Sequence, residues 1–239
     1  MNEITARLEL LEERIEAACR RSGRKRSEIQ VMAVSKFHPP ESVEAAYSAG
    51  IRLFGENRVQ EAMKKFAGFW ERYPRDGVGV QLHLIGSLQR NKAPAAASFF
   101  DCIQSVDRDS LIDELGNLTT GRECPLMVML EYHTGEETKA GFPDMDSLFR
   151  AAERTLSFPG LRPIGLMTMA PFTDDETAVR ASFRKLAAAR CELEKRFSDK
   201  KNFDWSCLSM GMTGDFEIAI EEGSTLIRIG TAIFGERAA

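Results

Sequence analysis

Histidine is scarce in this sequence, and cysteine never occurs in a pattern that binds metal or forms a disulfide framework. The three histidines, His38, His83 and His133, stand in no HExxH or comparable ligand spacing. The five cysteines are odd in number, scattered, and never form a CxxC pair. We therefore expect no catalytic metal and no disulfides, and a reducing compartment, the cytoplasm.

Long apolar runs and an excess of basic residues are also missing. No apolar run approaches the length of a membrane span, and the amphipathic start, MNEITARLELLEERIEAACRR, has no signal-peptide core. The formal net charge of −4 provides no basic surface for a nucleic acid. We expect a protein without membrane or nucleic-acid partners.

The composition is that of an ordinary globular protein. Hydrophobic residues make up 43% and charged residues 28% of the 239 positions, a length at which an α/β barrel still forms one domain. The sequence contains no linker, repeat or low-complexity tract. It therefore predicts a single domain over residues 1–239.

Strand and helix patterns alternate along the whole chain. After a leading amphipathic helix over residues 2–21, eight short apolar strands are predicted, over residues 29–34, 51–57, 80–89, 100–106, 125–132, 161–169, 203–212 and 225–235. A helical segment follows each of the first seven. This alternation predicts an α/β fold, a single (β/α)₈ barrel of parallel strands with an extra N-terminal helix. A doubly wound open sheet is the alternative, but the first strand continues into SKFHPP and not into a GxGxxG turn.

A lysine stands at the exit of the first predicted strand. Lys36 follows the apolar run 29–34 and precedes Pro39 and Pro40. Desolvation at the end of a buried strand lowers the pKa of a lysine, and a neutral amine is the nucleophile that Schiff-base chemistry requires. The alternative is a lysine that extends its ammonium group to solvent.

Small, hydroxylated and cationic residues stand at the exits of the last two strands. Strand seven continues into SMGMTG at 209–214, and strand eight contains Arg228 before Gly230 and Thr231. In a barrel these exits commonly form a phosphate site, because glycines admit an anion close to the backbone. Arg228 shares a face with Gly230 and needs an acceptor, such as a ring nitrogen of a ligand. The alternatives are glycines that serve only turns and an arginine in an internal ion pair.

Other strand exits add Asn57, His83 and Met167 to the same end of the barrel. A lone histidine on an apolar face is more often a core residue, so both interpretations of His83 stay open. A lysine amine, an anion cradle and an arginine opposite a heteroaromatic nitrogen together suit pyridoxal 5′-phosphate (PLP). An aldolase of sugar phosphates would also use the lysine and the cradle, but has less need for the arginine.

Several segments resemble the YggS/PROSC family of pyridoxal phosphate homeostasis proteins. They are AVSKFHPPE around Lys36, RLFGENRVQEAMKK, HLIGSLQRNK, GLMTMAPF and SMGMTGDFEIAIEEGSTLIRIGTAIFGER, and they extend over almost the whole chain. The resemblance implies a PLP-binding barrel of fold type III, like the N-terminal domain of alanine racemase, with PLP as an internal aldimine on Lys36. It also implies that Arg228 faces the pyridine nitrogen. The expected cofactor-binding residues are Lys36, Asn57, His83, Met167, Ser209, Met210, Arg228, Gly230 and Thr231, with Ser209, Gly230 and Thr231 at the phosphate.

The function that the resemblance implies is intracellular PLP homeostasis. Family members bind the cofactor, and no catalytic residue is established for them. We therefore expect a monomeric carrier of PLP, with PLP-dependent apo-enzymes as partners. The alternative is a small amino-acid racemase that uses Lys36 as one base and Tyr132 or His83 as the other. One departure from the family concerns the end of strand five, where an asparagine is usual and this chain reads Glu131-Tyr132-His133.

Overall fold

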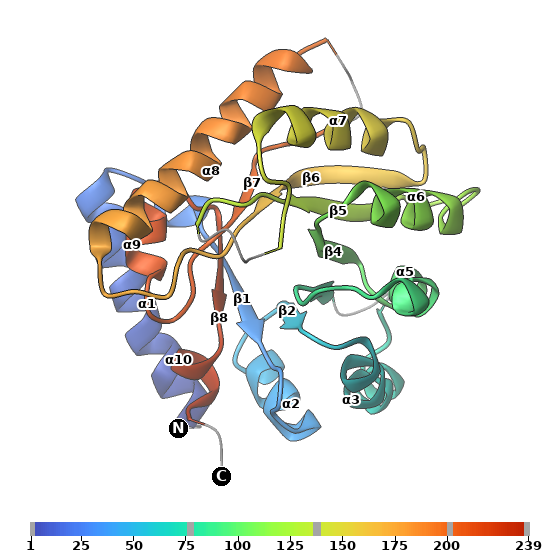
Figure 1. The fold of residues 1–239 in the computed structure, drawn as a ribbon. Coiled ribbons are helices and arrows are strands. Elements are labelled where there is room, and N and C mark those ends of the chain that lie inside the picture. Colours follow the sequence, from blue (N-terminus) through green and yellow to red (C-terminus); the bar gives the residue numbers. More distant parts are fainter. Residues whose placement is uncertain (1–2, 76–78, 136–139, 200–202, 237–239) are drawn as a thin grey trace.

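Eight parallel strands close into a barrel, in which each strand pairs with its neighbours in the sequence and β8 pairs with β1 (Figure 1). The computed structural model describes residues 3–75, 79–135, 140–199 and 203–236. The strands are β1 (Gln30–Val34), β2 (Leu53–Glu56), β3 (Gln81–Leu84), β4 (Cys102–Val106), β5 (Leu126–Glu131), β6 (Leu161–Met167), β7 (Cys207–Ser209) and β8 (Leu226–Ile229).

Helices surround the barrel and connect its strands. They are α1 (Glu3–Ser22), α2 (Pro40–Ser48), α3 (Val59–Arg72), α5 (Ala93–Phe99), α6 (Asp109–Leu118), α7 (Met145–Leu156), α8 (Glu176–Arg196), α9 (Phe216–Glu221) and α10 (Thr231–Phe234), with short 3₁₀ turns η1 (Arg26–Glu28) and η2 (Arg90–Lys92). The leading helix α1 packs beside α9 and α10, so the first and last described helices lie on the same side of the barrel (Figure 1).

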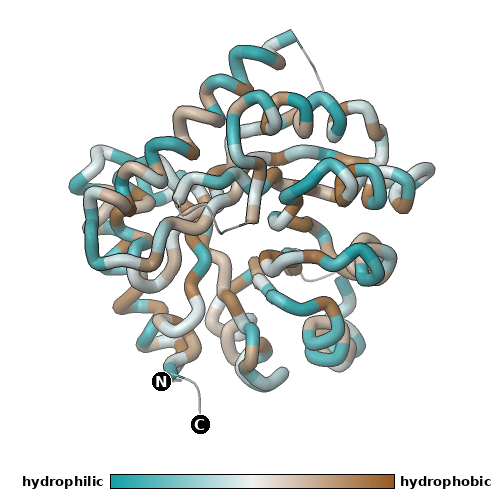
Figure 2. Tube along the Cα trace, in the orientation of Figure 1, coloured by the Kyte–Doolittle hydropathy of each residue, from teal (hydrophilic) through white to brown (hydrophobic). Residues whose placement is uncertain are grey.

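Apolar side chains form two kinds of core. The larger core fills the layer between the strands and the surrounding helices, and brown and teal segments alternate along these helices in Figure 2. Two small clusters lie inside the barrel, because alternate residues of each strand point inward. They consist of Met32, Val34 and Leu226, and of Cys102, Met129 and Met167. Polar side chains occupy much of the remaining interior, including Gln104, Ser209 and Arg228, which are buried.

The predicted barrel with its leading helix is confirmed, and three of the predicted strands are much shorter than expected. Strand β3 ends at Leu84, β7 covers only Cys207–Ser209, and β8 ends at Ile229, although strands over 80–89, 203–212 and 225–235 were expected. Gly230 leaves the strand conformation at φ −106° and ψ −82°, and its carbonyl accepts hydrogen bonds from the amides of Ile233 and Phe234. These bonds start α10 where the apolar pattern predicted continuing strand. Among the described residues, no helix is long and apolar enough to cross a membrane.

A close approach of two strands explains one glycine of the barrel. Gly165 in β6 pairs with Cys207 in β7. A Cβ atom on Gly165 would lie 1.8 Å from the Cys207 carbonyl oxygen, which is far inside van der Waals contact. Gly68 in α3 contrasts with it, because a Cβ atom there would meet nothing within 4 Å.

We predict opposite effects on stability for alanine at these two glycines. Gly165→Ala should lower the free energy of unfolding by about 2 to 3 kcal/mol, because the added methyl group forces β6 and β7 apart. Gly68→Ala should raise it by up to about 1 kcal/mol, because alanine favours an exposed helix position. Urea unfolding of both variants measures the two changes. Equal effects would contradict the close approach of β6 and β7.

Candidate functional site

A cavity of about 240 Å³ opens at the C-terminal end of the barrel strands. Six of the residues predicted for a ligand site line it: Lys36, Asn57, Met167, Arg228, Gly230 and Thr231. Met169, Met212, Thr213 and Gly214, from the loops after β6 and β7, complete much of the wall. The cavity therefore combines a primary amine, a guanidinium group, two hydroxyls and two glycines.

Arg228 is buried at the base of this cavity, and backbone carbonyls hold its guanidinium group. One terminal nitrogen donates to the Ser209 carbonyl at 2.7 Å and to the Ser209 hydroxyl at 2.8 Å. The other donates to the Thr168 carbonyl at 2.8 Å. Burial lowers the pKa of Arg228 to about 10, so the side chain is still a cation at neutral pH. The hydrogen-bond acceptors of this cation are thus two backbone carbonyls and one hydroxyl, and none of them is a carboxylate.

A chain of hydrogen bonds continues from Arg228 across the barrel interior. The Ser209 hydroxyl accepts from Arg228 and donates to Gln104 Oε1 at 2.6 Å. The Gln104 amide nitrogen then lies 2.9 Å from His83 Nδ1 and donates to it. His83 is therefore the tautomer with its proton on Nε2. Burial lowers the pKa of His83 to about 3, which keeps the ring neutral.

Three of the predicted site residues do not line the cavity of Lys36. His83 lines a different cavity, of about 700 Å³, which also includes Gln30 and Gln81 at the N-terminal ends of β1 and β3. Ser209 lies beneath Arg228 as its hydrogen-bond acceptor, and Met210 is buried in the core between sheet and helices. Alternation explains Met210, since its neighbour Ser209 faces the barrel interior.

The loop between β7 and α9 forms one wall of the cavity through Met212, Thr213 and Gly214. An Asp215 carboxylate oxygen accepts from the amide of Met212 at 2.6 Å and closes this loop on itself. The loop is thereby fixed at the start of α9.

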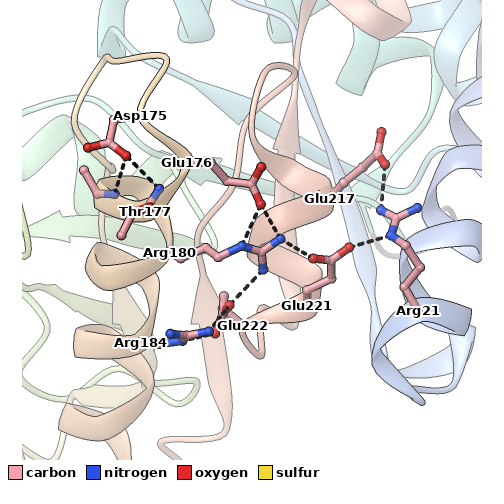
Figure 3. A network of polar contacts seen from close by, with 10 residues as sticks. Arg21, Asp175, Glu176, Thr177, Arg180, Arg184, Glu217, Glu221 and Glu222 are labelled. Carbon is pink, nitrogen blue, oxygen red and sulfur yellow. Dashed lines mark hydrogen bonds and ion pairs between the residues drawn. The ribbon is translucent and has the colours of Figure 1, made fainter.

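Ion pairs hold α9 between two neighbouring helices (Figure 3). Arg21 of α1 pairs with Glu217 and Glu221 of α9. On the other side, Arg180 of α8 pairs with Glu221 and Glu222. Several pairs that share partners stabilise more than isolated surface pairs do. The network therefore fixes the helix that follows the loop of the cavity wall.

The end of β5 places a carboxyl group beside the cavity without lining it. Glu131 is buried and pairs in register with Met167, which does line the cavity. The pKa of Glu131 is raised to about 7, mainly by burial and also by the Asp107 carboxylate, while the Arg228 cation acts in the opposite direction. Tyr132 is buried as well, and the Lys185 ammonium lies 5.2 Å from its ring centroid. The described part of the chain does not place Tyr132 in the cavity wall.

Sequence reasoning missed Gln104 and Thr168, which connect the site to the barrel wall. A weak signal for Gln104 was available, because it is a polar residue inside the apolar strand segment FDCIQSV. Nothing comparable marks Thr168, because it contributes its backbone carbonyl, which every residue has.

Comparison with known proteins gives consistent matches over nearly the whole chain. Residues 7–238 match the family described as alanine racemase, N-terminal domain. A pyridoxal phosphate homeostasis protein of Aquifex aeolicus is 39% identical over 232 residues, which cover 97% of this chain and 97% of that protein.

Two solved structures share the barrel. One, described as an unknown protein from Bifidobacterium adolescentis, is 35% identical with a TM-score of 0.90, and the match covers 97% of this chain and 94% of that one. The other is PipY of Synechococcus elongatus PCC7942 with PLP bound, which is 33% identical with a TM-score of 0.82 and covers 98% of this chain and 100% of that one.

We predict that Glu131 makes the protein less stable as pH rises through the neutral range. The folded protein holds a proton on Glu131 up to a pKa of about 7, whereas the carboxyl group ordinarily titrates at 4.5. The folded state thus binds more protons between these values, and this contribution to stability is lost as pH rises. Glu131→Gln should remove the loss, which amounts to about 3 kcal/mol.

Urea unfolding of parent and variant at about pH 5 and about pH 8 measures this effect. The difference between the two proteins isolates Glu131 from His83, whose lowered pKa changes stability in the opposite direction. Glu71→Gln, at an exposed position of α3, is the control. The same pH dependence in parent and Glu131→Gln would contradict the raised pKa.

Proposed function

The chain belongs to the family of pyridoxal phosphate homeostasis proteins, and we propose that it binds PLP in the cavity of Lys36 and releases it again without chemical turnover. The observation that carries this proposal is the convergence of Lys36, Arg228, Gly230 and Thr231 on one cavity. The PLP bound to PipY, which shares the barrel over its full length, supports the same ligand.

The residues of the cavity fit the parts of PLP. The hydroxyls of Thr213 and Thr231 and the backbone at Gly214 and Gly230 suit a phosphate, because they supply donors and admit an anion closely. Arg228 suits the ring nitrogen as a hydrogen-bond donor. When bound, PLP supplies an aldehyde that reacts reversibly with primary amines.

Lys36 supplies the amine for this reaction. A neutral amine adds to the aldehyde carbon and one water molecule leaves, so hydrolysis or exchange with another amine releases the ligand again. A reversible covalent bond holds the cofactor and still allows its transfer. We propose PLP-dependent apo-enzymes as recipients and a monomeric carrier in the cytoplasm, in agreement with five unpaired cysteines.

Arg228 explains why the site can hold PLP without turning it over. Its cationic guanidinium group disfavours a proton on a facing ring nitrogen, and an unprotonated ring is a weaker electron sink for a carbanion. Three hydrogen bonds to Ser209 and Thr168 keep the guanidinium group in place. Arg228 therefore favours storage of PLP over chemistry at an amino-acid Cα.

A racemase would need a second acid/base residue across the cavity from Lys36. The two residues considered for this role were Tyr132 and His83, and neither lines the cavity in the described part of the chain. Their positions favour the carrier.

We predict a visible absorption band when the purified protein is loaded with PLP, and complete loss of this band in Lys36→Ala. The band reports the conjugated bond between the ligand and the Lys36 amine, which the variant cannot form. Lys64→Ala, at an exposed position of α3, is the matched control and should keep the band.

Two outcomes would contradict the proposed function. A parent protein without the band at any PLP concentration would refute PLP as the covalent ligand of Lys36. Deuterium exchange at Cα of amino acids in heavy water, at rates typical of an enzyme, would refute the carrier and favour the racemase.

A further inference from the structure

A buried cluster of charges lies directly behind the loop that carries Lys36. Lys65 of α3 and Glu56 at the end of β2 are both buried, and their side chains form an ion pair at 2.6 Å. Glu61, one helical turn before Lys65, lies 3.3 Å from the same ammonium group. An isolated buried charge is costly, so each member of such a cluster needs its partners in place.

The cluster contacts the backbone on both sides of Lys36. The Lys65 ammonium donates to the Ser35 carbonyl at 2.6 Å, and the Ser35 hydroxyl donates to Glu56 at 2.6 Å. On the other side, the amide of Phe37 donates to a Glu61 carboxylate oxygen at 2.6 Å. The residues before and after Lys36 are thus both bonded to side chains of α3.

The backbone of this loop adopts a conformation that needs such support. Phe37 has φ +65°, and it is the one described residue other than glycine with a positive φ. A bulky side chain disfavours this left-handed region. A turn bond from the His38 amide to the Ser35 carbonyl also closes the loop around Lys36, at 3.1 Å. The direction in which Lys36 leaves β1 therefore depends on a turn that is unfavourable by itself.

We propose that Glu61 and Lys65 are positioning residues, which hold the turn at Phe37 and thereby direct the Lys36 amine into the cavity. Lys65 anchors the turn at Ser35, and Glu61 anchors it at Phe37. The inference rests on the proposed function, because it concerns how readily Lys36 reaches the aldehyde of PLP. Neither residue lines the cavity, so neither contacts the ligand.

Glu61 is the better residue to test, because its side chain is 25% exposed whereas Lys65 is 5% exposed. Removal of Lys65 would leave Glu56 buried without its cation and endanger the fold. Glu61→Ala removes the acceptor of the Phe37 amide and leaves the Glu56 pair intact. Glu61→Gln keeps an oxygen that accepts this hydrogen bond, so it serves as the rescuing variant.

We predict that Glu61→Ala slows formation of the covalent bond to Lys36 about tenfold at saturating PLP, the loss expected from one charge-assisted hydrogen bond. Stopped-flow absorbance measures the rate, and borohydride reduction followed by mass spectrometry locates the bond. Total bound PLP, from equilibrium dialysis, should change by less than about twofold, because the phosphate-binding residues belong to other loops. Glu61→Gln should restore most of the rate, and Glu71→Ala on the same helix should leave it unchanged.

Hydrogen exchange of the Phe37 amide, measured without PLP, separates the two ways in which this test can fail. If the parent forms the bond and Glu61→Ala matches its rate, the positioning role is overturned while the proposed function stands. If the parent forms no bond, the proposed function fails, and faster exchange at Phe37 in Glu61→Ala still supports the anchored turn. Unchanged exchange at Phe37 would overturn the turn anchor itself.

Discussion

A buried arginine needs hydrogen-bond acceptors, and in this barrel Arg228 finds them at the two strands that precede its own. The terminal nitrogens of Arg228 in β8 donate hydrogen bonds to Ser209 in β7 and to Thr168 just after β6. These bonds connect three consecutive strands at the level of the cavity base. Carbonyl dipoles and a hydroxyl thus stabilise the cation, which keeps its charge at neutral pH. The cavity wall thus contains Arg228 and Lys36 beside uncharged residues such as Asn57 and Thr231.

A second buried charge, Lys65, supports the ends of β1 and β2, and β1 pairs with β8. Lys65 connects β1, β2 and α3 through Ser35, Glu56 and Glu61. Arg228 lies inside the barrel and Lys65 lies outside it, between the strands and α3, so the two cations stabilise the site from two layers. Desolvation makes both arrangements sensitive to the loss of a single partner.

In the hydrogen-bond chain from Arg228 to His83, the donors and acceptors of the polar barrel interior follow one order. The guanidinium group donates to the Ser209 hydroxyl, this hydroxyl donates to Gln104 Oε1, and the Gln104 amide nitrogen donates to His83 Nδ1. The last of these bonds fixes the tautomer of His83, whose side chain lines a different cavity from Lys36. A polar interior therefore serves here to orient Arg228, and not to bring His83 to a ligand.

Much of the site could be predicted because strand exits in a barrel share one end. Lys36, Asn57, Arg228, Gly230 and Thr231 were all identified as exit residues, and they line one cavity. His83, Ser209 and Met210 were assigned to the same end, but a shift of one or two residues along a strand changes the face or the depth of a side chain. The depth of a side chain along the barrel is hard to predict from local sequence, because the register of each strand depends on its neighbouring strands.

The sequence by itself determined the alternation of strands and helices, the closed barrel that follows from it, and the lysine at the first strand exit, since each depends on local periodicity. Only the tertiary structure decided which polar groups pair inside the barrel. Lys65 on an apolar helix face reads as an ordinary helical lysine until Glu56 and Ser35 are placed against it. Pairing of buried charges depends on distances between residues remote in sequence, and these distances exist only after the barrel closes.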